Sequence, residues 1–182
     1  SLTGAGDLAL QAKRLRSTRS LWDPTYVDES WIAGAGPDGG IVKLIQAMEA
    51  WIAEGYPATK LEIGEYNWGG LEHINGALAQ ADVLGIFGEL GVDLATHWDP
   101  PQLGQPGSFA WRIYRNYDGA GSAFGDTAVQ AVSGDRAQLA IYAAERSSDG
   151  ALTVMVVNKA MAPVSATLSL ANFAAGGPTL VS

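Results

Sequence analysis

A carboxylate stands among aromatic and amide side chains in the segment Glu65-Tyr66-Asn67-Trp68-Gly69. The segment follows a short apolar stretch, so Glu65 is predicted at the carboxyl end of a strand, where barrel enzymes keep their active sites. Indole rings stack on the apolar face of a pyranose, and amide groups hydrogen-bond to its hydroxyls. The pattern therefore fits a sugar site, while a surface Glu beside a core Trp would explain the same spacing.

Two further tryptophans extend this candidate site. Trp98-Asp99 ends the next predicted strand and would bring a second aromatic ring and a second carboxylate to the same edge. Trp22 lies in an irregular loop, because Pro24 biases the residue before it away from the helical region. For each tryptophan, packing in the core is the alternative interpretation.

Helices and short strands that could position these residues alternate through the first two thirds of the chain. Apolar residues recur at helical spacing, with Gly or Pro after the last turns. The predicted helices are Leu8–Thr18, Ile41–Glu54, Glu72–Leu90 and Ser108–Asn116, and the predicted strands are Lys60–Tyr66 and Val92–Trp98. In the first strand, Leu61, Ile63 and Glu65 would share one face. Such alternation with short connections predicts a parallel α/β sheet.

The last third has a different character. Four segments at regular spacing are predicted to be antiparallel strands of a sandwich: Thr127–Val132, Gln138–Glu145, Leu152–Asn158 and Val164–Leu170. All six tryptophans lie before this region. We therefore predict two domains, residues 1–118 (α/β) and 119–182 (all-β), with a linker at Asp118–Gly121.

Composition narrows the classes of function. The 182 residues include 11 basic and 19 acidic side chains, and the net charge of -8 argues against nucleic acid or an anionic membrane as a partner. A neutral sugar remains compatible with this charge. The chain has no cysteine, which excludes a thiol nucleophile, and only His73 and His97 supply imidazoles, so we assign no metal site.

Three stretches resemble the carboxyl-terminal half of glycoside hydrolase family 44. They are Leu21–Trp31 (LWDPTYVDESW), Leu61–Gly69 (LEIGEYNWG) and His73–Gly88 (HINGALAQADVLGIFG), the last followed by Val92–Trp98 (VDLATHW). The resemblance implies a (β/α)8 TIM barrel with an attached β-sandwich. It also implies a secreted endo-β-1,4-glucanase (a cellulase), often also a xyloglucanase, which acts on β-1,4-glucan with retention of configuration and needs no redox cofactor.

The resemblance also implies roles for individual residues. Glu65 would be the nucleophile after barrel strand seven, and Trp98 would follow strand eight and stack on the sugar. The remaining expected sugar-binding residues are Tyr66, Asn67, Trp68 and Trp22. At Gly64 the family pattern leads us to expect Thr.

Retaining hydrolysis needs two carboxyl groups roughly 5–5.5 Å apart. The Asn-Glu motif that carries the family's acid/base residue after strand four is absent, and only strands seven and eight of the barrel are recognisable. Strand alternation places Glu62 on the face opposite to Glu65, so we do not expect it to act as the second carboxyl group. Glu72 and Glu89 lie on a helix, Asp28 and Glu29 lie in a loop, and Asp99 is the least unfavourable substitute.

These gaps leave three accounts. The chain is a fragment whose acid/base residue and amino-terminal half of the barrel lie elsewhere, which we favour. Alternatively, two copies complete one another, or a non-catalytic carbohydrate-binding fragment has kept only its sugar surface.

Overall fold

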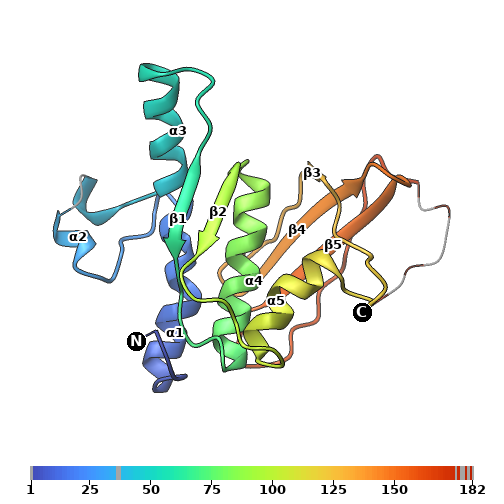
Figure 1. Cartoon of the computed structure of the whole chain (residues 1–182), viewed down its shortest axis with the longest axis horizontal. Coiled ribbons are helices and arrows are strands. Elements are labelled where there is room, and N and C mark those ends of the chain that lie inside the picture. Colours follow the sequence, from blue (N-terminus) through green and yellow to red (C-terminus); the bar gives the residue numbers. More distant parts are fainter. Residues whose placement is uncertain (1, 36–37, 175, 177–178, 180, 182) are drawn as a thin grey trace.

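The computed structural model describes residues 2–35, 38–174, 176, 179 and 181. They form two small sheets and several helices, with one long helix, α4, between the sheets (Figure 1). The helices are α1 (Leu8–Ser17), α2 (Ile32–Ala35), α3 (Leu44–Gly55), α4 (Ile74–Glu89) and α5 (Pro106–Arg115), with short 3-10 turns η1 (Thr18–Leu21) and η2 (Asp38–Gly40). The strands are β1 (Glu62–Tyr66), β2 (Leu94–His97), β3 (Thr127–Val129), β4 (Leu139–Arg146) and β5 (Ala151–Asn158).

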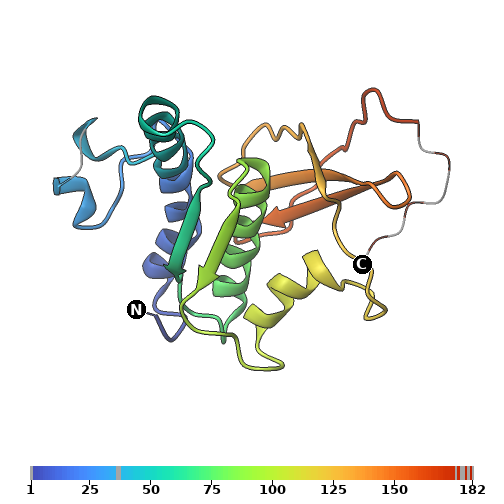
Figure 2. The same cartoon turned by 45° about the horizontal axis from the view of Figure 1, so that its top comes forward.

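The first sheet consists of the parallel strands β1 and β2, which α4 connects. Parallel neighbours require such a crossover connection, so the alternation in the sequence correctly predicted this unit. In Figures 1 and 2, α1 and α4 lie on one side of the pair. Leu94 and Thr96, on the opposite side of β2, are exposed. One face of the small sheet is therefore packed and the other is open.

Helix α4 is buried on more sides than its apolar stripe predicted. It packs against α1, α5, β4 and β5, and its polar residues Gln80 and Asp82 are fully buried. Small residues allow this close packing: a Cβ atom at Gly85 would lie 2.3 Å from the Tyr142 ring. A helix between two sheets has no solvent face, so a one-sided hydrophobic pattern describes it poorly.

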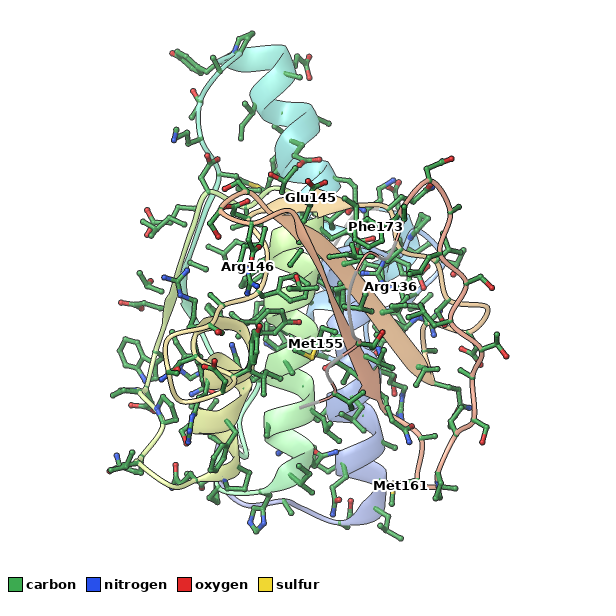
Figure 3. All side chains as sticks on the ribbon, turned by 90° about the vertical axis from the view of Figure 1, so that its right-hand side faces the viewer. Arg136, Glu145, Arg146, Met155, Met161 and Phe173 are labelled. Atoms are coloured by element: carbon green, nitrogen blue, oxygen red, sulfur yellow. The ribbon has the colours of Figure 1, made fainter. Side chains whose placement is uncertain are left out.

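The second sheet is antiparallel, in the order β3-β4-β5. Tyr142 of β4 and Val157 of β5 belong to the same hydrophobic cluster as Ile86 of α4. Met155 extends from β5 and packs against this cluster (Figure 3). Side chains from both predicted domains thus share one core, and the division at residue 118 stays a prediction.

Helix ends differ from the sequence prediction by a few residues. The predicted cap, Ser108, lies inside α5 and its hydroxyl donates to the Gln105 carbonyl at 2.7 Å. The helix begins earlier because Pro106 suits the first turn, where no amide donor is needed. Lys43, which lies within the predicted helix Ile41–Glu54, has φ 37° and precedes α3.

The prediction of a strand at Val164–Leu170 was wrong. The described residues of this segment form no strand, and Val164, Leu168 and Leu170 are exposed. Met161 and Phe173, which flank the segment, lie at the outside of the molecule (Figure 3). Alternating polarity produces a strand only where a neighbouring edge supplies hydrogen bonds, and this segment adds to neither sheet.

Candidate active site

Glu65 occupies a β-bulge near the carboxyl end of β1. The register pairs Ile63 with Ala95 and Tyr66 with His97, so β1 carries one residue more than β2 between these pairs. Glu65 itself has φ 55°. Bulges insert an unpaired residue and redirect the side chains that follow, often next to active sites.

The bulge corrects the predicted face pattern. Simple alternation would place Glu65 on the same side as Ile63, but Ile63 is half-buried and Glu65 is exposed. Tyr66, which alternation would expose, is instead buried. The extra residue thus gives Glu65 access to solvent and returns Tyr66 to the core.

Hydrogen bonds from β2 hold this irregular end of β1. The Glu65 amide donates to the Thr96 hydroxyl at 3.1 Å, and the Trp98 amide donates to the Tyr66 carbonyl at 3.0 Å. A positive φ is uncommon for a residue with a side chain and costs about 1–3 kcal/mol. The surrounding contacts must therefore compensate for the backbone strain at Glu65.

The parity argument that set Glu62 apart from Glu65 does not hold in the structure. Glu62 is exposed, and a Cβ atom added at Gly64 would lie 3.8 Å from its Oε1 and 3.6 Å from the Thr96 Oγ1. Glu62, Gly64 and Thr96 therefore share the open face, which the bulge also gives to Glu65. Both distances are ordinary van der Waals contacts, so the site has room for a Cβ atom at Gly64.

Tyr66 lies in the core and supports the site from behind. Its side chain is 8% exposed, and its hydroxyl accepts a 2.8 Å hydrogen bond from Gln80 Nε2 of α4. Its ring meets those of Phe87 and His97 edge-on, at centroid distances of 5.2 Å and 5.0 Å. Burial raises the pKa of the Tyr66 hydroxyl. A ring enclosed in this way supports the strand end from the core side.

His97 links this aromatic cluster to α5 and was missed as a site residue. Its ring meets Trp111 edge-on at 5.1 Å, and its Nδ1 hydrogen-bonds to the Asp99 carbonyl. Burial lowers the pKa of the His97 ring. The neutral form can donate from Nδ1 to this carbonyl, which ties the chain after β2 to the core.

Asn67 and Trp68 form the turn that follows β1. The Asn67 side-chain carbonyl accepts the Gly69 amide at 2.6 Å, a local turn contact. Trp68 is half-buried, and its indole N–H donates to the Ser17 hydroxyl of α1 at 3.0 Å. The Asn67 side-chain carbonyl and the Trp68 indole N–H therefore already have partners within the chain. Any role in sugar binding falls to the side-chain NH2 group of Asn67 and to the ring of Trp68.

Arg14 anchors the same turn from α1. It is 4% exposed and donates to the Trp68 carbonyl at 3.1 Å and to Asn75 Oδ1 at 2.6 Å. Burial lowers the pKa of its guanidinium. The five donors of a guanidinium are held in a fixed fork and can satisfy several carbonyls at once, so the buried Arg14 can bridge α1 and this turn.

Trp22 packs against a cation. The Arg136 guanidinium, labelled in Figure 3, lies 4.3 Å from the Trp22 ring and 5.3 Å from the Tyr142 ring. Arg136 also forms an ion pair with Glu89 of α4. The packing alternative therefore describes Trp22 better than a sugar platform, because the guanidinium covers a ring face.

Trp98 is the predicted aromatic residue that stays open to a ligand. It follows β2 directly, its side chain is 55% exposed, and the adjacent Asp99 is also exposed. Glu65 and Trp98 thus lie at the carboxyl ends of neighbouring parallel strands, joined through the Trp98–Tyr66 backbone bond. A solvent-accessible carboxylate and a solvent-accessible indole therefore come from adjacent strand ends.

A separate cavity of about 320 Å³ lies between α4, α5 and the antiparallel sheet. Trp111, Tyr114 and Phe124 contribute to its lining, whereas none of the predicted site residues does. Within the described part of the chain, no group of three or more His, Asp or Glu side chains is arranged to hold a metal ion. The candidate site therefore consists of the ends of β1 and β2.

Comparisons with known proteins show that the chain is similar to parts of several carbohydrate-active enzymes. No family model matches it. Endoglucanase A of Paenibacillus lautus is 39% identical over 169 residues, 92% of this chain. The structure of CelM2, a bifunctional glucanase-xylanase from a metagenome library, matches 87% of this chain with 50% identity and a TM-score of 0.81. A Paenibacillus polymyxa xyloglucanase from GH family 44, solved with xyloglucan, matches 88% with 34% identity and a TM-score of 0.79.

The chain spans only a part of each of these proteins. It covers 24% of the Paenibacillus lautus protein, 29% of the CelM2 chain and 32% of the xyloglucanase chain. The identities extend over most of the chain, so the likeness includes its sequence as well as its fold. The mixed helices and small sheets fit a partial domain of such an enzyme.

Proposed function

The chain is related in sequence and structure to the glycoside hydrolases of family 44, and from that premise we propose that it forms the carboxyl-terminal part of an endo-β-1,4-glucanase. In this proposal, residues 1–118 supply the last strands and helices of a (β/α)8 barrel, and residues 119–182 belong to a β-sandwich. The open face of β1 and β2 would then line the interior of the barrel, and the amino-terminal half of the barrel would be the missing partner.

Glu65 is the proposed nucleophile. The observation that carries this role is the bulge, which brings a strained, exposed carboxylate to the carboxyl end of β1 beside Trp98. Active sites of barrel enzymes are built at that end of the strands. Glu65 would attack the anomeric carbon, form a glycosyl-enzyme intermediate and be released by water.

The acid/base residue is proposed to lie outside this chain. Glu29 forms an ion pair with Arg16, and Glu89 forms one with Arg136, so both are engaged elsewhere. Asp99 is exposed and lies two residues after the end of β2, the strand that pairs with the one carrying Glu65. A carboxylate from the missing half would protonate the leaving oxygen and then activate the water.

Trp98 is the proposed platform for the sugar ring, and Asn67 and Trp68 would contribute at the rim of the cleft. The exposed indole of Trp98 offers a flat apolar face at the strand end next to that of the proposed nucleophile. The polymeric substrate is proposed to be a β-1,4-glucan, with xyloglucan as a second substrate, because related enzymes carry the names glucanase and xyloglucanase. Secretion is proposed on the same ground. None of the described helices is long and apolar enough to cross a membrane.

A substrate that needs no acid catalyst tests this division of roles. With 2,4-dinitrophenyl β-cellobioside, the leaving group departs without protonation, so Glu65 can form the glycosyl-enzyme unaided. Water would then react slowly without a base, whereas azide needs none. We expect azide to accelerate dinitrophenolate release by the purified chain and to yield β-cellobiosyl azide, with both effects lost in Glu65→Gln.

Unmodified soluble β-1,4-glucan is the matched control substrate, since its leaving group requires an acid. We expect no release of reducing ends from it by the chain alone. Hydrolysis of this glucan would contradict the external acid/base residue. Binding of cello-oligosaccharides without any turnover of the activated substrate would favour the alternative, a non-catalytic carbohydrate-binding fragment.

A further inference from the structure

The strained backbone at Glu65 raises the question of what keeps it in place. A bulge leaves the extra residue without a regular ladder partner. Here the acceptor for the Glu65 amide is a side chain, the Thr96 hydroxyl on the neighbouring strand, at 3.1 Å. The bond is therefore specific to the residue at position 96.

The alternative conformation has a defined consequence. If Glu65 relaxed to an ordinary strand conformation, alternation would turn its side chain toward the packed face that holds Ile63. The left-handed conformation instead keeps Glu65 exposed, together with Thr96 and Trp98. The hydrogen bond to Thr96 favours the bulged form and so keeps the carboxylate on the open side.

Thr96 is suited to this task by its own position. Its neighbours in β2, Ala95 and His97, face the packed side, while Thr96 is exposed on the open one. A β-branched residue has few χ1 rotamers in a strand, so the hydroxyl is held close to one direction.

We propose that Thr96 is a positioning residue that sets the orientation of the Glu65 carboxylate by accepting its backbone amide. The inference rests on the proposed role of Glu65 as nucleophile. It adds a residue of β2 to the catalytic arrangement, one that acts through the Glu65 backbone.

The test measures how fast the chain is labelled by 2,4-dinitrophenyl 2-deoxy-2-fluoro-β-cellobioside, followed by intact mass. This reagent transfers its sugar to a nucleophilic carboxylate and needs no acid. Thr96→Val keeps the shape of the side chain and removes the acceptor, and Thr96→Ser keeps the acceptor. Thr127→Val, on β3 of the other sheet, is the matched control.

We expect Thr96→Val to lower the limiting rate of labelling about 10- to 100-fold, as small misplacements of reacting groups do. The half-saturating reagent concentration should stay within about twofold, because the residues that bind sugar are unchanged. Thr96→Ser should recover most of the rate, and Thr127→Val should match the wild type. Equal limiting rates for Thr96→Val and wild type would overturn the proposal.

A second measurement does not depend on labelling. The Glu65 amide should exchange with solvent faster in Thr96→Val than in wild type, read by nuclear magnetic resonance on the full chain, with the rest of β1 unchanged. An unchanged amide would also overturn the proposal. If the wild-type chain is not labelled at all, the assignment of Glu65 as nucleophile fails. The amide exchange rate still tests whether Thr96 holds the Glu65 backbone, because that measurement does not need a nucleophile.

Discussion

A buried ion pair joins α4 to the end of the antiparallel sheet, and its removal makes the most quantitative prediction. Lys159 Nζ lies 2.9 Å from Asp82 Oδ2, and both side chains are 1% exposed. Asp82 also accepts from the Thr18 hydroxyl at 2.7 Å and from the Tyr142 hydroxyl at 2.6 Å. A single carboxylate on α4 thus connects η1, β4 and the residue that follows β5.

Lys159→Met keeps the apolar stem and leaves the Asp82 carboxylate buried without its cation. Breaking such a pair typically costs about 3–5 kcal/mol, a large share of a usual unfolding free energy of about 5–15 kcal/mol. With a urea dependence of about 2 kcal/mol per molar, the unfolding midpoint should fall by about 1.5–2.5 M.

The assay is urea unfolding followed by tryptophan fluorescence and circular dichroism. Lys60→Met is the matched control, because Lys60 is 83% exposed and lies 3.5 Å from Asp93. A surface pair of this kind contributes only about 0–1 kcal/mol. The double variant Asp82→Leu with Lys159→Met should lose less unfolding free energy than the two single variants lose together. Removing both charges at once leaves no buried charge without its partner. A midpoint shift for Lys159→Met no larger than that for Lys60→Met would refute the reasoning.

Two further predictions concern the aromatic residues and the pH dependence. Trp98→Ala should abolish measurable binding of cello-oligosaccharides in calorimetry with little loss of stability, whereas Trp22→Leu should lower the melting temperature and leave binding intact. The reverse pattern would contradict the roles given to the two rings. The hydrogen bond from Arg16 lowers the pKa of Glu29 from 4.5 to about 2. A carboxyl group with a lowered folded-state pKa stabilises the fold above its unfolded pKa, so stability should fall as pH drops from 4.5 toward 2. Glu29→Gln should flatten this dependence in urea titrations at several pH values, and an unchanged slope would show that other carboxylates cause it.

Periodicity in the sequence predicted the elements that carry the site. Helical spacing in α4 and the two short apolar runs on either side of it were sufficient to place Glu65 and Trp98 at the ends of adjacent parallel strands. Local patterns of this kind depend on residues a few positions apart. Such patterns can therefore be recognised without knowledge of the rest of the fold.

The bulge could not be predicted in the same way. Alternation assigns each residue of a strand to a face by counting, and one unpaired residue at Glu65 reverses every later assignment. This error placed Glu65 and Ile63 on one side and excluded Glu62. A Gly before a charged residue at a strand end was the available signal, since such glycines often mark bulges.

Contacts between distant segments were also beyond the sequence. The Arg136 cation that covers Trp22 and the Lys159 cation that meets Asp82 come from the last third of the chain. Composition cannot distinguish a tryptophan in the core from one at a site, because both are large and apolar. Trp22 and Trp98 look alike in sequence, and only their neighbours in space separate them.

The most direct test of the central claim locates the label from the fluorinated cellobioside by peptide mapping after digestion. The account predicts one adduct per chain, on the peptide with Glu65, and none in Glu65→Gln. An adduct on Glu62 or Asp99, or no adduct on the wild-type chain, would contradict the assignment of Glu65 as the nucleophile.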